Sequence, residues 1–385
     1  MESGMRFILA LTAVLATGSA LQAADPTFPS SAGNLAVQTV AKGLVHPWAL
    51  AFLPDGRMLV TERPGRMRIV ARDGQLSPAL GNVPKVFAIG QGGLLDVILD
   101  RHYEQNQTVY FCYAEPIADS PDTSRARTTL ARAKVLNSAT PTLEEVQTIF
   151  RQDGPPSSGN HFGCRIVQMP DDTLSLTLGE HFTARDEAQN LANHLGKIVR
   201  ITPEGAPAPG NPFIDKPGAR PEIWSYGHRN PQGLAINPAD GKLWEQEHGP
   251  MGGDEINLIV PGHNYGWPLV CYGLNYDGSP VGTGKATMAG IDDPLWHWTP
   301  SIAPSGMAFY TGDLFPGWKG SLFNGALKFQ MLVRLEIKGD KVVKEERLLQ
   351  GLRERIRDVR QGPDGALYLL TDNASGRILR VAPAK

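Results

Sequence analysis

Two neighbouring segments of this 385-residue chain carry far more polar chemistry than a half-buried strand requires. The first, residues 224–233, contains Arg229, an imidazole and two side-chain amides. The second, residues 247–257, adds another imidazole, the backbone kink of Gly249-Pro250 and several acidic side chains. Together these groups supply bases, anion ligands and metal ligands. The two segments therefore predict a functional site.

A histidine and a glutamine outside these segments are further candidates. His161 lies between Gly159 and Gly163, just before a predicted strand. Most histidines in such a place are packed or hydrogen-bonded in the core, whereas flanking glycines favour a close approach of the backbone to a ligand. Gln91, within a Gly-Gln-Gly-Gly run, is either a simple turn residue or a ligand-binding residue.

Several cations follow predicted strands. Arg355 and Arg357 alternate with a period of two, which puts both guanidinium groups on one face of a strand. A solvated strand face has the same pattern. Lys328 follows an apolar strand and is a weaker signal. With Arg229, these residues give four cations that could bind a polyanionic ligand.

One strand–turn–strand design recurs along the chain and must position these residues. Glycine (42) and proline (31) are plentiful and lie between short β-rich runs. Pro and Asp set a tight turn, and Gly supplies positive φ where it is present. Long amphipathic helices are not predicted. The clearest hairpins cover residues 52–62, 168–180, 236–243 and 361–372.

The spacing of these hairpins predicts the fold. The turn aspartates fall near positions 55, 172, 240 and 364, and the two wide gaps are each about twice a common spacing of roughly 60 residues. Weaker units, at residues 93–113 and 306–327, fill those gaps. Six such units predict an all-β, six-bladed β-propeller, with a pair of β-sandwiches as the alternative. A propeller places binding groups at the mouth of its channel, on one or two loops per blade.

The N-terminus predicts export. Arg6 precedes an apolar run of about ten residues, and small residues near Ala24 offer a cleavage point. We therefore expect residues 1–24 to be a signal peptide and residues 25–385 a single propeller domain, periplasmic or secreted. An uncleaved anchor is the alternative. The apolar run is too short to span a bilayer, so no membrane insertion is expected.

Cysteine content and charge limit the remaining possibilities. Cys112, Cys164 and Cys271 are odd in number and far apart, so no disulfide framework can be read from them. The formal charge of −2 carries no signature of nucleic-acid or membrane binding. A small or neutral ligand is favoured.

Six motifs, in order along the chain, resemble the soluble quinoprotein sugar dehydrogenases, and most closely their aldose sugar dehydrogenase branch. These enzymes are six-bladed propellers that carry pyrroloquinoline quinone (PQQ) and calcium. The resemblance extends from about Gly43 to Val381. The matching segments are residues 90–95, 159–163, 227–233, 247–257, 264–268 and 355–359.

The resemblance implies a role for each matched residue. His161 is the general base for the anomeric hydroxyl of an aldose, which becomes a lactone as hydride moves to PQQ. Arg229 stabilises the charge that develops on the quinone oxygen. The substrate side contains Gln91 and Trp298, although core packing is an equally good interpretation of the tryptophan. The cofactor is held by Asn230, Lys328, Arg355 and Arg357.

The resemblance also implies calcium. The backbone carbonyls of Gly249 and Pro250 bind an ion that polarises the quinone. A second, structural ion takes Asp254, Glu255 and the backbone of Tyr265, although solvated acids are the alternative. Zinc is not expected, because no closely spaced His/Cys set accompanies His228, His248 or His263.

Two positions depart from the family pattern. Asn275 stands where we align an aspartate, which leaves one side-chain calcium ligand in doubt. Glu180 and His181 replace an expected Gly-Asp-Arg run. The substrate range is therefore open at that loop.

Three functions compete at this point. The first is a PQQ-dependent aldose dehydrogenase that passes electrons to an unidentified quinone or cytochrome, as a monomer or homodimer. The second is a metal-dependent sugar lactonase of similar shape, and the third a non-catalytic propeller that binds a glycan or protein. Lactonase sites need convergent carboxylates and amides around a metal, whereas the strongest segments here are rich in Arg and Lys. The dehydrogenase is therefore preferred.

Overall fold

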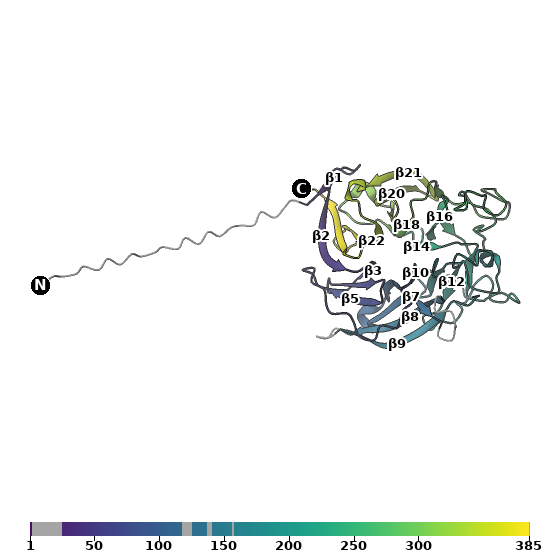
Figure 1. Cartoon of the computed structure of the whole chain (residues 1–385), viewed down its shortest axis with the longest axis horizontal. Coiled ribbons are helices and arrows are strands. Elements are labelled where there is room, and N and C mark those ends of the chain that lie inside the picture. Colours follow the sequence, from purple (N-terminus) through teal and green to yellow (C-terminus); the bar gives the residue numbers. More distant parts are fainter. Residues whose placement is uncertain (2–24, 118–124, 137–140, 156–157, 385) are drawn as a thin grey trace.

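The computed structural model describes residues 1, 25–117, 125–136, 141–155 and 158–384. Within them, six antiparallel sheets surround a central axis (Figure 1). Blade 1 is β3 (Pro47–Phe52), β4 (Met58–Glu62) and β5 (Arg66–Val70). Blade 2 is β6 (Leu94–Leu99), β7 (Thr108–Pro116), β8 (Ala126–Leu136) and β9 (Thr142–Arg151). Blade 3 is β10 (Gly163–Gln168), β11 (Leu174–Leu178), β12 (Lys197–Ile201) and β13 (Ile223–Tyr226).

The other three blades follow in chain order. Blade 4 is β14 (Pro231–Ile236), β15 (Leu243–Glu247), β16 (Asp254–Ile259) and β17 (Trp296–Trp298). Blade 5 is β18 (Pro304–Phe309), β19 (Leu322–Ala326), β20 (Met331–Lys338) and β21 (Lys341–Leu348). Blade 6 is β22 (Ile356–Gln361), β23 (Leu367–Thr371) and β24 (Gly376–Pro383), extended by β2 (Leu35–Leu44) and β1 (Thr27–Phe28). The helices are short: α1 (Tyr103–Asn106), η1 (Arg185–Gln189), η2 (Pro316–Trp318) and η3 (Gln350–Leu352).

Each predicted hairpin is the first pair of strands of one blade. In blade 1, the N–H of Gly56 donates to the carbonyl of Leu53, and Oδ1 of Asp55 accepts the N–H of Arg57. In three other blades the turn aspartate likewise accepts the backbone N–H of the residue two positions later; these aspartates are Asp171, Asp240 and Asp364. The weaker units at 93–113 and 306–327 also form such hairpins.

The ring closes by pairing the two ends of the chain. β2, from the N-terminal region, runs antiparallel to the C-terminal β24, with Val37 opposite Val381. β2 and β24 lie side by side in Figure 1. The six-bladed β-propeller predicted from the hairpin repeat is confirmed, and a pair of β-sandwiches is excluded.

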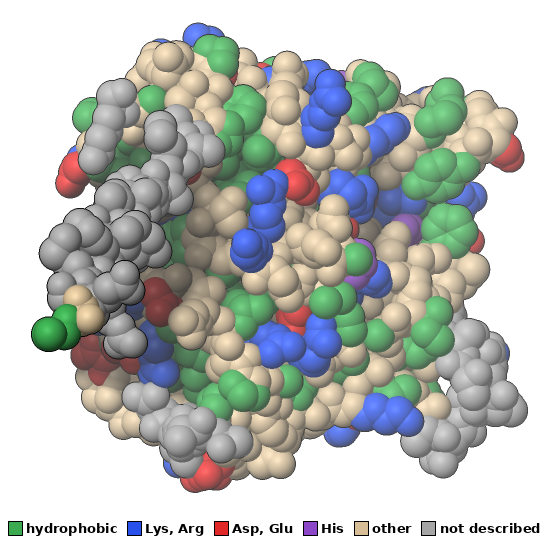
Figure 2. All heavy atoms as spheres, turned by 60° about the vertical axis from the view of Figure 1, so that its left-hand side comes forward, with side chains coloured by type: hydrophobic (Ala, Val, Ile, Leu, Met, Phe, Trp, Pro, Cys, Tyr) green, Lys and Arg blue, Asp and Glu red, His purple; other side chains and the backbone are tan. Residues whose placement is uncertain are grey.

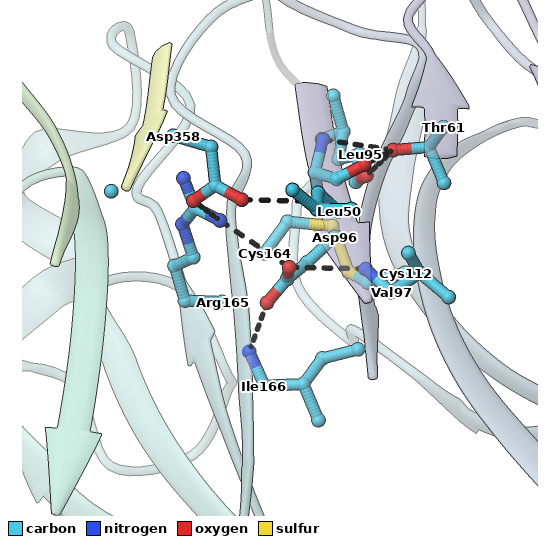
Figure 3. Close-up of polar contacts among 12 residues, drawn as sticks. Leu50, Thr61, Leu95, Asp96, Val97, Cys112, Cys164, Arg165, Ile166 and Asp358 are labelled. Atoms are coloured by element: carbon cyan, nitrogen blue, oxygen red, sulfur yellow. Dashed lines mark hydrogen bonds and ion pairs between the residues drawn. A yellow bond between two sulfur atoms is a disulfide. The ribbon is translucent and has the colours of Figure 1, made fainter. Parts of the chain in front are cut away.

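The six inner strands, β3, β6, β10, β14, β18 and β22, pack against their neighbours around the axis. At their centre lies Arg165 of β10, which is 3% exposed. Its guanidinium pairs with Asp358 at 2.9 Å and Asp96 at 3.3 Å, and its Nε donates to the carbonyl of Gln232 at 2.7 Å. It also lies 4.1 Å from the ring centre of Trp48. One side chain thus joins blades 1, 2, 4 and 6 to blade 3. Figure 3 shows Arg165 with its two carboxylate partners, Asp96 and Asp358.

A disulfide joins two blades beside this centre. Cys112 of β7 is bonded to Cys164 of β10, the residue before Arg165, and Cys271 is free. Figure 3 shows the sulfur bridge next to Asp96. The count and spacing of the cysteines do not reveal this pairing, because it depends on two strands from different blades.

On the face drawn in Figure 2, the cationic, acidic and hydrophobic side chains of the described residues are interspersed. No helix in the described part of the chain is long and apolar enough to cross a membrane. The predicted signal peptide falls almost entirely on residues 2–24, outside the described residues.

Candidate active site

Four of the candidate residues, Gln91, Asn230, Arg355 and Arg357, meet at one end of the propeller axis. The first strand of each blade starts at this end, and the second strand returns to it. A cavity of about 320 Å³ opens there. Every blade contributes to its lining, for example through Trp48, Leu95, Gly163, Asn230, Leu327 and Arg357. Trp48 and Gln232 belong both to this lining and to the contacts of Arg165, so the buried ion pairs lie next to the cavity.

His161 directly precedes Phe162 and Gly163, which line this cavity, and is itself 4% exposed. Its Nδ1 is 3.1 Å from Oε1 of Glu180, and its backbone N–H donates to Oε1 of Gln91 at 2.8 Å. A carboxylate only accepts hydrogen bonds, so this contact assigns the proton to Nδ1 and leaves the lone pair on Nε2. The left-handed backbone of His161, with φ of 52°, is strained, as is frequent at functional sites.

The electrostatic surroundings favour a neutral imidazole. Burial lowers the pKa of His161, and the positive charge of Arg229 lowers it further. Glu180 opposes both effects, but the net shift is downward. At neutral pH His161 is therefore uncharged and able to accept a proton.

One carboxylate binds the backbone N–H groups of both Arg229 and Asn230. Oε2 of Glu247 accepts the backbone N–H of Arg229 at 2.5 Å and that of Asn230 at 3.1 Å. The Arg229 guanidinium donates to the carbonyls of His248 and Gly249, at 3.0 and 2.8 Å. Oδ1 of Asn230, whose side chain is buried, accepts a hydrogen bond from the N–H of Gly163 at 3.2 Å. These bonds fix both side chains beside the start of β14.

The sequence prediction that Arg355 and Arg357 lie together is correct. Both line the cavity and share Asp372, at 3.0 and 3.4 Å. Arg355 is 44% exposed, whereas Arg357 is 12% exposed and burial lowers its pKa to about 10. Arg63 joins them in the lining. Lys328 is exposed and follows Leu327, a lining residue.

The cavity suits an anionic ligand. Its described lining holds three arginines, Arg63, Arg355 and Arg357, against the single carboxylate of Asp372. The buried Nε of Arg357, a lining residue, has no hydrogen-bond partner in the described part of the chain. The same holds for the buried Nε of Arg229, which lines a smaller void that shares His248 with the cavity. Buried donors rarely remain unpaired, so these two atoms indicate a missing acceptor.

Close packing and hydrogen bonds fix the backbone at the Gly249-Pro250 kink. A Cβ on Gly249 would lie 2.2 Å from the carbonyl oxygen of Gly252, so only glycine fits. The Gly249 N–H donates to Oδ1 of Asp254 at 2.9 Å, while Oδ2 of Asp254 accepts N–H groups ahead of β18, at 2.7 and 3.0 Å. Burial raises the pKa of Asp254 to about 6.

Asp254 and Glu255 do not converge, because adjacent strand residues point to opposite faces. Asp254 faces the start of β18, whereas the Glu255 carboxylate accepts a bond from Asn257 on the other face, at 3.2 Å. Glu255 also lies opposite Glu247 in the β15–β16 pairing. The role of Asp254 as a calcium ligand stays a prediction, and its position gives that role no support.

A buried acidic cluster lies on the Glu255 face of blade 4. Glu245 and Glu247 of β15 approach His228, with one ligand atom from each within 4.8 Å of the others. Nδ2 of Asn257 bridges Glu245 and Glu255 at 3.1 and 3.2 Å. Burial raises the pKa of Glu245 and Glu255 well above the usual range, and Glu247 adds to the shift in both.

This cluster fits a cation. Oε1 of Glu245 and Oδ1 of Asn257 are buried and without a partner among the described residues. A void of about 10 Å³ is lined by Glu247 and Glu255 of this cluster, by Tyr265 and also by Arg229. The donor set is mainly oxygen, which suits calcium better than zinc. The sequence offered no His/Cys set. Glu245 and Glu247 share a face because they alternate along β15, and strand pairing places Glu255 opposite Glu247.

Trp298 lies apart from the cavity. It is 3% exposed, packs in a core between blades 4 and 5, and donates its Nε1 hydrogen to Oε2 of Glu345 at 2.8 Å. Gln91 is exposed and lines the cavity. The core alternative for Trp298 matches its position, and its role toward substrate remains an unsupported prediction.

Sequence reasoning missed three residues that organise this site. They are Glu180, which holds His161; Glu247, which holds Arg229 and Asn230; and Arg63, which donates to the carbonyl of Gly90 at 2.6 Å. Each ends the second strand of a blade or lies within two residues of that end. A charged residue at that position of the repeated hairpin is the sequence signal that could have identified all three.

The fold and site define a six-bladed propeller with a histidine–carboxylate pair beside a cationic cavity. The chain matches the family model described as glucose/sorbosone dehydrogenase over residues 44–380, and it belongs to this family. The dehydrogenase family expected from the motifs is thereby confirmed.

Individual relatives agree with this assignment. The chain is 44% identical to aldose sugar dehydrogenase YliI of Escherichia coli, over 97% of this chain and 98% of that protein. It superposes on the apo-form of the soluble E. coli aldose sugar dehydrogenase with a TM-score of 0.86, at 45% identity, covering 91% of this chain and all of that one. The PQQ-bound aldose sugar dehydrogenase of Streptomyces coelicolor gives a TM-score of 0.73 at 33% identity, covering 90% and 98%.

Proposed function

We propose that this protein is a periplasmic or secreted PQQ-dependent aldose dehydrogenase that oxidises the anomeric hydroxyl of aldose sugars to lactones. The observation that carries the proposal is the pairing of His161 with Glu180 beside a cavity where three arginines face one carboxylate. A neutral base and an excess of cations fit a sugar hydroxyl and an anionic cofactor. A lactonase or a purely binding propeller gives no reason for this combination.

His161 acts as the general base. Glu180 keeps the proton on Nδ1, so Nε2 accepts the proton of the anomeric hydroxyl. The hydrogen on the anomeric carbon leaves with its electron pair, and the carbon–oxygen bond becomes the lactone carbonyl. When bound, PQQ supplies the acceptor for that hydride.

The cationic side chains hold and polarise the cofactor. Arg357, Arg355, Lys328 and Asn230 would hold its carboxylates and ring oxygens, the arginines by charge-assisted hydrogen bonds. Arg229, whose buried Nε lacks a partner among the described residues, would stabilise negative charge on the quinone oxygen. Glu247 keeps Arg229 and Asn230 in place through their backbone N–H groups.

Two calcium sites belong to this proposal. The carbonyls of Gly249 and Pro250 would hold an ion that acts as a Lewis acid toward the quinone. Glu255 and the backbone of Tyr265 would hold a structural ion, and the buried carboxylates of Glu245 and Glu247 add negative charge there. The Cys112–Cys164 disulfide supports a location outside the cytoplasm, because disulfides persist in oxidising compartments.

The test is reconstitution. Purified protein is loaded with PQQ and calcium, and the reduction of an artificial dye is followed with glucose and other aldoses. His161→Ala should retain the spectrum of bound PQQ while the rate of cofactor reduction falls on the order of 10²–10⁴-fold. His102→Ala is a matched control, because His102 is 62% exposed and does not line the cavity. No dye reduction with any aldose by folded wild-type protein would contradict the proposal.

A further inference from the structure

His46 lies where the chain leaves the ring-closing strand β2 and enters the inner strand β3. Its Nδ1 is 2.8 Å from Oδ1 of Asp372, and its backbone N–H donates to the carbonyl of Asn373 at 2.8 Å. Both partners come directly after β23, so these bonds join the start of blade 1 to blade 6. The His46 carbonyl accepts the N–H of Arg63 at 3.0 Å. One residue thus contacts the carboxylate of the cavity lining and one of its three arginines.

Asp372 is the partner that the other two cavity arginines share. Its side chain is 12% exposed, and its Oδ2 accepts hydrogen bonds from Arg355 at 3.0 Å and from Arg357 at 3.4 Å. A carboxylate only accepts hydrogen bonds, so the contact at Oδ1 assigns a proton to Nδ1 of His46. Burial would raise the pKa of Asp372, but Arg357 and the hydrogen bond from His46 outweigh it and lower the pKa. The carboxylate is therefore charged, and each oxygen has its own donors.

This division of the two oxygens decides which donors Arg357 keeps for a ligand. A carboxylate with both oxygens free tends to bind one guanidinium through two parallel N–H groups. With Oδ1 occupied by His46, Arg357 reaches the carboxylate through Nη2. Its Nη1 donates to Gln232 at 3.1 Å and to Ser305 at 3.0 Å. The buried Nε has no partner in the described part of the chain, so that donor is left for a ligand in the cavity.

The backbone of His46 keeps this contact against a local preference. Its φ of 46° is left-handed, a region that few residues other than glycine occupy. Such conformations persist where the surrounding bonds determine them, and they are frequent at functional sites. The side chain is 32% exposed, so burial of the ring is incomplete. The hydrogen bond to Asp372, rather than core packing, accounts for a histidine at this position.

We propose that His46 is a positioning residue for the anion-binding cavity: its Nδ1–H occupies one oxygen of Asp372 and so keeps the guanidinium donors of Arg355 and Arg357 free for the carboxylates of the cofactor. This inference rests on the proposed function for the identity of the anion. His46 does not line the cavity, so it acts through Asp372. The alternative is a purely structural role, in which His46 only closes the ring between blades 6 and 1.

The test separates the hydrogen bond from the backbone conformation. His46→Gly removes the imidazole and tolerates a left-handed φ, whereas His46→Asn also tolerates it and offers an amide N–H in the place of Nδ1. Each purified variant is titrated with PQQ in the presence of calcium. His46→Gly should raise Kd for PQQ about tenfold, the lower end of what a hydrogen bond to a charged group contributes. His46→Asn should bind PQQ as wild type.

His102→Gly is the matched control, because His102 also faces an aspartate, 3.5 Å from Asp172, but does not line the cavity. It should leave Kd for PQQ unchanged. Should His46→Gly not fold, His46→Asp replaces it, because Asp has the shape of Asn but offers no N–H. That variant should bind PQQ more weakly than His46→Asn by at least as much.

The outcomes distinguish this inference from the proposed function. Equal affinity of His46→Gly and wild type for PQQ, whatever their melting temperatures, would overturn the positioning role, and so would a loss of affinity that His46→Asn does not restore. In either case oxidation of aldoses by the wild type would leave the proposed function intact. If the wild type binds PQQ but oxidises no aldose, the proposed function fails, and the titration still decides the role of His46.

Discussion

Nδ1 of His161 lies 3.1 Å from Oε1 of Glu180, and both side chains are at least 95% buried. A buried imidazole with a carboxylate at Nδ1 has a fixed tautomer and orientation. The same carboxylate accepts the N–H of Phe182, so one group sets the geometry on both sides of the proposed base. Glu180 is therefore a positioning residue for His161.

Replacing Glu180 by Gln should slow cofactor reduction by sugar about 10- to 100-fold, the scale known for losing a carboxylate that orients a metal-bound histidine. Gln has nearly the same shape, but its amide can donate to Nδ1 and so permit the wrong tautomer. Stopped-flow kinetics of the PQQ-loaded variant measure the change. A rate equal to that of wild type would show that Glu180 has only a packing role.

The pH profile gives an independent test of the same pair. Because burial and Arg229 lower the pKa of His161 below its usual 6.5, the acidic limb of kcat/KM should lie below that pH. Glu180 raises the pKa of His161, so Glu180→Gln should move this limb to still lower pH. A limb that moves upward would contradict the assigned electrostatics.

The two cavity arginines should differ in their contribution to cofactor binding. Arg357 is 12% exposed, and Arg357→Ala should weaken PQQ reconstitution by about 1.5–3 kcal/mol, the scale of a charge-assisted hydrogen bond. Arg355 is 44% exposed and screened by water, so Arg355→Ala should cost less than about 1 kcal/mol. PQQ titration measures both. Arg353→Ala, two residues away and exposed, is the control and should bind as wild type.

The sequence predicted the local hairpins well, because Pro-Asp turns are encoded within a few residues. Asp55, Asp240 and Asp364 make the expected turn bonds, although in the blade 3 hairpin Asp171 makes the bond rather than Asp172. The number of blades followed from the spacing of these turns. The closing pair of β2 and β24 could not be predicted, because it joins the two ends of the chain.

The site was harder to predict, because its partners come from different blades. The motif match selected His161 and Arg229, yet neither Glu180 nor Glu247 was expected to hold them. The grouping of Asp254 with Glu255 ignored a signal that was present, since neighbours in a strand face opposite sides. The acidic cluster of Glu245 and Glu247 has that same alternation and could have been found from it.

The disulfide should contribute to stability. Cys112 and Cys164 are 52 residues apart, and closing a loop of that length typically stabilises a fold by about 2–4 kcal/mol. A Cys112→Ser, Cys164→Ser double variant should therefore melt several degrees lower than wild type. Thermal scans with and without reductant check this. Cys271→Ser is the control, since Cys271 is free and its loss should leave the response to reductant unchanged.

Calcium should stabilise the protein in the absence of PQQ, and more strongly as pH rises. Burial and Glu247 raise the pKa of Glu245 and Glu255. In the metal-free fold both carboxyls therefore stay protonated at pH values above 4.5, the ordinary Glu pKa, where they ionise in the unfolded chain. This contribution to stability is present at acidic pH and is lost as pH rises from there toward the raised folded-state pKa values. Calcium binds the deprotonated carboxylates, so the stability that it adds increases as pH rises.

Thermal melting with calcium or with a chelator, at about pH 5 and about pH 7.5, tests this linkage. The calcium-dependent rise in melting temperature should be small at the lower pH and clear at the higher one. Glu255→Gln should abolish the rise, because the substitution removes a proposed calcium ligand. At the higher pH, the metal-free variant should be as stable as metal-free wild type or more stable, because the substitution removes a buried charge. Glu204→Gln, at a 70% exposed position, should keep the full calcium response. An equal calcium effect at both pH values would place the ion elsewhere.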